Sequence, residues 1–524
     1  MTRHQKPPQR WPRTLAAVLA GCAIGAPAWA ADPEIERVRA TTVRLINQLV
    51  DQGLLTRARG EALLKELEAA PAPTAASTAV PTTAPAAAPA AAAPPVRVPF
   101  VPEFVRNQMK EELRNELAAQ AAREGWAGPG VVPTWVRGLR VEGDLRTRLQ
   151  SDDFDAGNAA AISITDTNRN RALTLANTTV DRQRLRVRAR LGVVATADDN
   201  WSGSLRLTTG SSTDPLSSNQ TLGTYGNRFT TAFDRAFIRW RSGSSLNAVF
   251  GRFGNPWFGT DLVWANDLGF DGVAVQWTPS VGSWGRAFLT AAAMPVQEVE
   301  LDSADKWLYG VQAGMEWPGR GLVSGRVGLA YYHYTKLTGQ ANAPGSSLRD
   351  FTAPAFAQKG NTYFNISSDA ARPLLALAAD YRLVNLTGSI DILTIGWKHL
   401  VLTGDVVRNV GFKKAQVSAR VGTTVEPEVF GVQLRASLGD ADVDSRHKWQ
   451  VFLAYKRVER DAVPDAFTDS DLRGGGTDVK GYTLGASYGL GRNSSVTARW
   501  LSGDALSGPP LAVDTLQVDL QVKF

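Results

Sequence analysis

Arginine occupies every second position of one short segment of this chain. These arginines alternate mostly with apolar residues, and the charged members are Arg182, Arg184, Arg186, Arg188 and Arg190. A guanidinium stays charged in proteins and donates hydrogen bonds in a planar fork that matches carboxylates and phosphates. Because residues two apart share a face of a β-strand, the pattern predicts a strand with one cationic face and one apolar face.

The cationic face must meet water or counter-ions, because each arginine would cost about 2–4 kcal/mol against lipid at mid-depth. We interpret it as the wall of a pore that attracts anions, since rings of charge set channel selectivity. The alternative is a structural ladder paired with carboxylates of loops folded inward, such as Asp261 or Asp267. The acids predicted on the same faces are Glu142 and Asp144. The predicted pore-lining residues are Arg140, Arg146, Arg148, Arg184, Arg186, Arg188, Arg190 and Arg206, with Arg239 and Arg241 in support.

Segments in which apolar and polar residues alternate continue to the end of the chain. They predict the β-strands that position these arginines. The segment 136–150 has one apolar face, and the segment 306–317 places aromatic residues at both ends of its apolar face. Aromatic girdles of this kind mark the two interfaces of membrane barrels. The segment 515–524 has a fully polar face and a fully apolar face that ends in Phe524.

The connections between segments alternate in length. Long polar ones cover 151–181, 210–229, 254–270, 336–372 and 460–478. Outer-membrane barrels combine long external loops, short periplasmic turns and an even number of antiparallel strands. We therefore predict an all-β transmembrane antiparallel barrel over 134–524. It has sixteen strands around an open aqueous lumen, or eighteen if 373–393 is a hairpin rather than one long strand.

Composition is compatible with such a barrel. The chain is 44% hydrophobic with a mean hydropathy of −0.17, and no run of 18 apolar residues follows residue 30. Only a closed barrel would then cross a membrane. A large soluble periplasmic β protein has the same composition, so the strand pattern decides between them. The formal net charge of +7 falls to +3 without residues 1–30, and no basic tail predicts a nucleic-acid partner.

Residues 1–30 have the features of an export signal. A basic start precedes a short apolar stretch at 15–24, and Ala28-Trp29-Ala30 supplies small residues two apart. The pattern predicts cleavage after Ala30, which removes the single cysteine. Alternatively, Leu19-Ala20-Gly21-Cys22 resembles the lipobox of bacterial lipoproteins and would leave a lipidated Cys22.

The region before the barrel has a different periodicity. We predict a periplasmic helical hairpin over 31–69, an Ala/Pro-rich linker over 70–99 and an amphipathic helix over 100–125. The apolar stripe of the last helix is narrow. It favours a coiled coil between subunits of a homo-oligomer such as a trimer, or else a helix docked on a surface.

Two loops contain further candidate sites. The loop 254–270 is rich in glycine and aromatic residues and is either a constriction folded into the lumen or an ordinary external loop. The loop 459–478 contains many acidic residues, whose carboxylate oxygens are suitable ligands for calcium. It lacks the EF-hand spacing, however, and is better interpreted as a solvated loop. The motifs of common hydrolases, zinc sites and phosphate loops are missing, so we expect neither an enzyme nor a cofactor or metal site.

Several segments resemble the putative porin family of proteobacterial outer-membrane proteins. They are VDQGLLT at 50–56, Trp135 with EGDLR at 142–146, GRFGNPWFG at 251–259, LTGDVVRN at 402–409 and the stretch 458–482. The resemblance covers nearly all of the chain after residue 30, apart from the linker. It implies an outer-membrane β-barrel that conducts small solutes and supplies no substrate. The terminal strand resembles the signal that such barrels present to the barrel assembly machinery, which implies that partner for Phe524.

We therefore expect a porin in the bacterial outer membrane, with its N-terminal region in the periplasm. It would form a water-filled channel for passive diffusion of small hydrophilic solutes, with a preference for anions. The alternatives are a barrel that anchors the envelope and conducts little, or a channel specific for one substrate. Only Phe233 and Phe237 are predicted lumen aromatics on the first four strands, which argues weakly against a sugar path.

Overall fold

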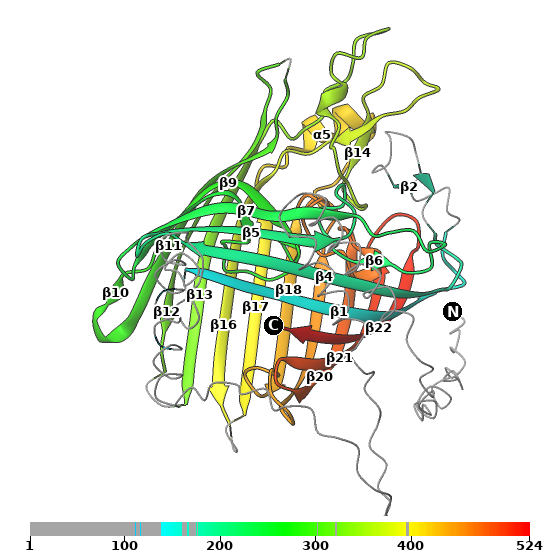
Figure 1. Cartoon of the computed structure of the whole chain (residues 1–524). Helices are drawn as coiled ribbons and strands as arrows, with labels where there is room; N and C mark the ends of the chain where they lie inside the picture. The colour runs from blue at the N-terminus through cyan, green and yellow to red at the C-terminus, as the bar shows by residue number, and fades with distance from the viewer. Residues whose placement is uncertain are drawn as a thin grey trace, which may run out of the picture. The chain divides into compact units, whose positions relative to one another are not determined.

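Sixteen antiparallel strands form a closed barrel (Figure 1). The computed structural model describes residues 138–159, 165–166, 174–175, 177–300, 302–319, 322–394 and 398–524, with Glu111 and Glu116. Each strand pairs with the next around the ring, and the last strand closes the barrel on the first. The ring consists of β1 (Leu139–Phe154), β4 (Arg182–Thr196), β5 (Trp201–Thr209), β7 (Thr231–Ser242), β8 (Leu246–Gly254), β9 (Gly269–Trp277), β11 (Gly285–Gln297), β12 (Lys306–Trp317), β13 (Val323–Thr335), β16 (Arg382–Leu393), β17 (His399–Asn409), β18 (Phe430–Gly439), β19 (Trp449–Val458), β20 (Val479–Gly491), β21 (Ser494–Ala505) and β22 (Ala512–Lys523).

The remaining short strands are not members of the ring. β6 (Gln220–Thr221) pairs with β4, and β10 (Ser280–Val281) pairs with β11. β14 (Tyr363–Asn365) pairs with β15 (Leu375–Leu377), and β2 (Thr165–Asp166) with β3 (Thr174–Leu175). The count of sixteen is confirmed and the alternative of eighteen is wrong. The segment 373–393 is nevertheless broken, because β15 belongs to a loop and only β16 enters the wall.

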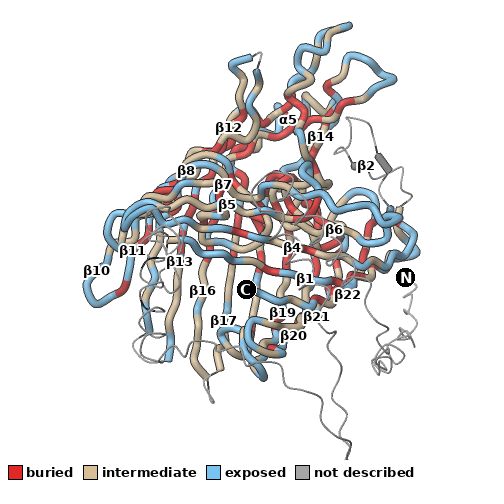
Figure 2. Tube along the Cα trace, in the orientation of Figure 1, coloured by how far each residue is buried: buried red, intermediate tan, exposed pale blue. Residues whose placement is uncertain are grey.

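The two faces of each strand differ as the alternation predicts. On β22, Thr515, Gln517 and Asp519 are buried inside the barrel, whereas Leu516 and Leu520 are exposed outside. Exposed apolar side chains recur at alternate positions of the other wall strands, so Figure 2 shows strongly exposed and buried segments intermixed along the wall. A soluble protein would bury this outer face, whereas lipid would cover it favourably.

Exposed aromatic side chains gather near both ends of the strands. Near the short turns they include Trp201, Trp277, Trp284, Trp449 and Phe524, and near the long loops they include Phe233, Tyr309, Tyr331, Phe430 and Tyr482, whereas Phe250 and Trp500 lie in the middle of their strands. On β12, Tyr309 and Trp317 lie roughly 27 Å apart along the strand. Two such girdles match the interfaces of a bilayer, where aromatic rings are enriched.

Long connections lie at one end of the barrel, here called the long-loop end, and short turns lie at the other, the short-turn end. All the predicted long connections lie at the long-loop end, but the alternation is not strict, because the connections 298–305 and 506–511 at that end are shorter than the turn 440–448 at the other. One further long connection, 410–429, contains α5 (Lys414–Val421), which lies beyond the strand ends near β14 (Figure 1). The described part of the chain has no helix long and apolar enough to cross a membrane.

The long loops pack against one another and form a core inside the long-loop half of the barrel. Its largest fully buried members include Trp264, Tyr332, Tyr334 and Tyr381, which come from two loops and the wall. The expectation of an open lumen therefore needs correction, because folded loops fill part of its width.

The predicted segments 1–30, 31–69 and 70–99 lie outside the described residues. The amphipathic helix over 100–125 is described only at Glu111 and Glu116, which are both helical.

Candidate permeation pathway

The loop 255–268 between β8 and β9 folds into the barrel and crosses its interior. Phe258 is held by Gln312 of β12, whose side-chain oxygen accepts from the backbone N–H at 2.8 Å and whose amide donates to the backbone carbonyl at 2.6 Å. Further along, the backbone N–H and hydroxyl of Thr260 both donate to Asp405 of β17, at 2.9 and 2.7 Å. Of the two interpretations open from the sequence, the inward-folded loop is the one observed.

A buried ion cluster fixes the same loop to the acidic loop 459–478. The Lys456 ammonium on β19 lies 3.0 Å from Asp261 and 2.9 Å from Asp469. Burial raises the pKa of Asp261, but the Lys456 charge, hydrogen bonds from Gln433 and Lys456 and the Arg435 charge together leave that pKa below its ordinary value. Asp261 thus pairs with a lysine and not with the arginine ladder.

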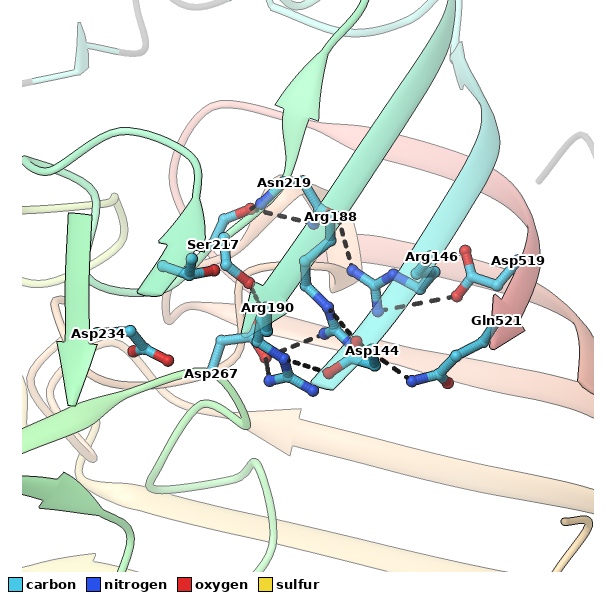
Figure 3. Close-up of polar contacts among 12 residues, drawn as sticks. Asp144, Arg146, Arg188, Arg190, Ser217, Asn219, Asp234, Asp267, Asp519 and Gln521 are labelled. Carbon is cyan, nitrogen blue, oxygen red and sulfur yellow. Dashed lines mark hydrogen bonds and ion pairs between the residues drawn. The ribbon is translucent and has the colours of Figure 1, made fainter. Parts of the chain in front are cut away.

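The other side of the loop faces the arginines of β4. Arg188 and Arg190 both bind Asp144 of β1, at 2.8 and 2.6 Å, and both approach Asp267 of the loop, at 3.3 and 3.6 Å (Figure 3). Burial raises the pKa of Asp267. The Arg188 charge, a hydrogen bond from Ser218 and the Arg190 charge lower it by more in total, so its pKa lies below the ordinary value. Two carboxylates therefore neutralise two arginines where the loop meets the wall.

A second cluster lies on the neighbouring strands β1, β21 and β22. Arg148 binds Asp519 with two hydrogen bonds of 2.6 and 2.9 Å and lies 3.5 Å from Asp471 of the loop 459–478. Arg499 contacts the same two carboxylates. Burial raises the pKa of Asp471, but the Arg499 and Arg148 charges, a hydrogen bond from Gln517 and the Arg146 charge together shift it downward.

Some of the remaining predicted pore-lining arginines form close ion pairs with carboxylates, and others are bound mainly by uncharged side chains. The ion pairs are Arg140 with Glu142, Arg184 with Asp152 and Arg206 with Asp234. Arg186 is instead bound by Gln150 and Ser217, and Arg146 by Asn219 with Asp519 at 4.0 Å. The structural ladder, weighed as the alternative, accounts for most of the β4 arginines, and Asp267 is one of its members.

Strand β7 carries arginines that form no ion pair with any described carboxylate: Arg235, Arg239 and Arg241. The sequence pattern missed Arg235, because a register shift opposite Arg206 and Leu207 inserts one extra residue at Asp234. The same bulge turns Phe233 to the outer face, where it is 64% exposed, so its assignment to the lumen is wrong. The bulge is visible only in the pairing register of β5 with β7, so the alternation within β7 alone does not reveal it.

Hollows lie on both sides of the cluster formed by Arg188, Arg190, Asp144 and Asp267. One of about 370 Å³ is lined on the long-loop side by Arg182, Arg184 and Arg186 together with Asp152, Asp214 and Asp471. Another of about 420 Å³ opens at the short-turn end between β1, β5 and β7 and is lined by Arg140, Arg206, Arg235, Arg239 and Arg241. The arginines thus follow the inner wall from one end to the other.

The loop 459–478 is not the solvated loop expected from its acids. Asp461 and Asp465 are almost fully buried and accept hydrogen bonds from Thr362, Tyr381 and Tyr363. Burial raises the pKa of Asp465 to about 7, although the Tyr363 hydrogen bond opposes this shift. Across the described ranges, no group of three or more His, Cys, Asp or Glu side chains has an arrangement that would hold a metal ion.

The family comparison matches this architecture. A model of the family described as "Putative porin" matches residues 39–524, which is most of the chain. The chain belongs to this family. Membership of the putative porin family supports an outer-membrane channel rather than an enzyme, as the resemblance of single segments implied. No curated protein matches the chain.

Solved structures similar to this putative porin include several bacterial outer-membrane proteins. OprB of Pseudomonas putida is 12% identical with a TM-score of 0.45, and the match covers 74% of this chain and 95% of that one. The outer membrane channel DcaP of Acinetobacter baumannii is 10% identical at 0.40, covering 74% and 97%. OmpT of Vibrio cholerae in its trimer form is 13% identical at 0.38, covering 74% and 99%.

Proposed function

We propose that the protein is a passive diffusion channel for small hydrophilic solutes and that it prefers anions. The family supports the channel, and the inner wall supports the preference. Arginines follow that wall through both hollows, and those of β7 lack carboxylate partners among the described residues. Fixed charges act over about a Debye length, roughly 8 Å at physiological salt, so the wall raises the local concentration of anions.

The unpaired arginines of β7 are the observation that carries this preference. The β4 arginines, which first suggested it, have much of their charge cancelled by Asp144, Asp152 and Asp267. Neutralised pairs keep the wall polar and hydrated but contribute little net field. The preference for anions therefore rests on Arg235, Arg239 and Arg241, with Arg146 and Arg186 as secondary contributors.

Liposome swelling separates this channel from a barrel that only anchors the envelope. Vesicles that contain the full chain should swell in small neutral and anionic solutes, and swell more slowly as solute size increases. Swelling at the rate of empty vesicles would reject the channel and favour the structural alternative. Uptake of a single solute with exclusion of others of equal size would favour a substrate-specific channel.

We also propose the orientation and assembly of the barrel. Long loops face the exterior and short turns face the periplasm, so the N-terminal region follows into the periplasm. The terminal strand, with Phe524, is the segment presented to the barrel assembly machinery. Association into a homo-oligomer such as a trimer would use the predicted helix at 100–125, and native mass spectrometry with and without this helix tests it.

A further inference from the structure

The hollow at the short-turn end is rich in arginine. It has a volume of about 420 Å³ and its walls come from β1, β5, β7 and the turn 197–200. Arg235, Arg239 and Arg241 contribute three guanidiniums from one strand. Acidic residues line both hollows: Asp152, Asp214 and Asp471 on the long-loop side, and Glu142, Asp198 and Asp199 at the short-turn end.

The acids around the short-turn hollow are engaged elsewhere or lie at its rim. Glu142 pairs with Arg140, and Asp234 pairs with Arg206. The carboxylate of Asp198 accepts the backbone N–H groups of Asn200 and Trp201 in the turn. Asp199 is exposed in the same turn. None of the three β7 guanidiniums forms an ion pair with a described carboxylate, although Glu142, Asp198 and Asp199 lie in the lining of the hollow.

Two of these arginines are held in place by packing rather than by ion pairs. The Arg239 guanidinium lies 5.3 Å from the centre of the Phe237 ring. The Arg235 guanidinium lies directly against Gly254 of β8, where the Cβ of any larger residue would come within 1.9 Å of it. The Nε atoms of Arg235 and Arg239 are buried with no hydrogen-bond partner. The same is true of other arginines of the inner wall, such as Arg184 and Arg186, so these donors mark the arginine-lined wall as a whole and not this hollow alone.

We propose that this hollow binds small multivalent oxyanions, which carry two or more carboxylate groups or a phosphate. Arg239 and Arg241 lie two residues apart on one strand, which is about 6.6–6.8 Å. A short dianion can contact both guanidiniums, and each guanidinium binds a carboxylate or phosphate through paired N–H groups. A monovalent carboxylate engages only one. The inference deepens the proposed function, because it names the class of solute that the channel concentrates at its short-turn end.

Calorimetry on the detergent-solubilised full chain tests this site without any need for conduction. Succinate and inorganic phosphate are the two probes, and acetate is the monovalent control. We expect succinate, phosphate or both to bind at least about tenfold more tightly than acetate. Loss of one charged hydrogen-bonding partner weakens binding by about tenfold or more, so the double variant Arg239→Gln/Arg241→Gln should abolish measurable binding of the dianions.

The matched control is Arg492→Gln, which removes a positive charge from the exposed turn between β20 and β21 at the same end of the barrel. It should leave binding unchanged. If succinate binds and phosphate does not, the site selects dicarboxylates; the reverse selects phosphate. Equal binding of acetate and the dianions, or dianion binding unaffected by the double variant, would overturn the site. Binding without swelling of vesicles would instead reject the channel and leave the site in place.

Discussion

Replacing Asp267 with Asn should make the channel more selective for anions. Asp267 lies on the inward-folded loop, 3.3 Å from Arg188 and 3.6 Å from Arg190, and accepts a hydrogen bond from Ser218 at 2.8 Å. Its pKa is below the ordinary value, so the carboxylate is charged at neutral pH and cancels part of the arginine charge. Asparagine keeps the shape and the acceptor for Ser218 while it removes the negative charge.

The size of the effect follows from screened electrostatics. One unit charge acts on an ion 6 Å away with about 0.7 kcal/mol in water, and screening at physiological salt reduces this to about 0.3 kcal/mol. This energy corresponds to a factor of about 1.7 in local concentration, upward for chloride and downward for potassium. The permeability ratio of chloride to potassium should therefore rise about threefold in Asp267→Asn.

Reversal potentials of single channels in unequal KCl measure this ratio. Asp442→Asn is the matched control, because it removes the same charge from an exposed carboxylate in the turn between β18 and β19, where Asp442 pairs with Lys448 at 2.7 Å. It should leave the ratio unchanged. A shift of Asp267→Asn toward cations, or equal shifts in both variants, would refute the assignment of Asp267 to the wall of the pathway.

Other predictions concern assembly, the loops and the N-terminal region. Phe524→Ala should lower the amount of folded barrel, measured by heat-modified mobility on gels, without changing unit conductance, because the ring covers Gly143 at the barrel closure. Burial raises the pKa of Asp465 to about 7, so its neutral form favours the folded loop and stability should fall as pH rises from about 4 to 7. Asp465→Asn should remove this pH dependence from the midpoint of thermal unfolding. If the pH dependence persists in the variant, another group causes it. Intact mass should give a mature start at Ala31, whereas a lipidated Cys22 start would contradict it. Deleting 32–125 should leave a conducting barrel, and loss of all folded barrel would count against separate folding.

The wall of the barrel could be predicted from the sequence because its signal is local. Alternation along β4 and β22 fixes which side chains face lipid, and turn residues separate the strands. The segment 373–393 shows the limit of this reasoning. Its first part alternates like a strand, but contacts with other loops hold it outside the ring, and those contacts join residues distant in sequence.

The charge of the pathway could be predicted only in part. Arginine spacing correctly indicated an inward cationic face on β4, but it could not show which carboxylates reach that face. Asp267 and Asp471 arrive from loops, and Asp519 from the last strand. The bulge at Asp234 changes the face of Phe233 and adds Arg235 to the lumen. Pairing across the barrel decides such features, and local sequence does not encode them.

The reversal potential of the unmodified full chain in unequal KCl tests the central claim most directly. An arginine-lined wall with unpaired guanidiniums on β7 predicts a potential of the sign set by chloride, with stronger selectivity at low salt because screening weakens. A potential of the sign set by potassium would contradict the proposed anion preference.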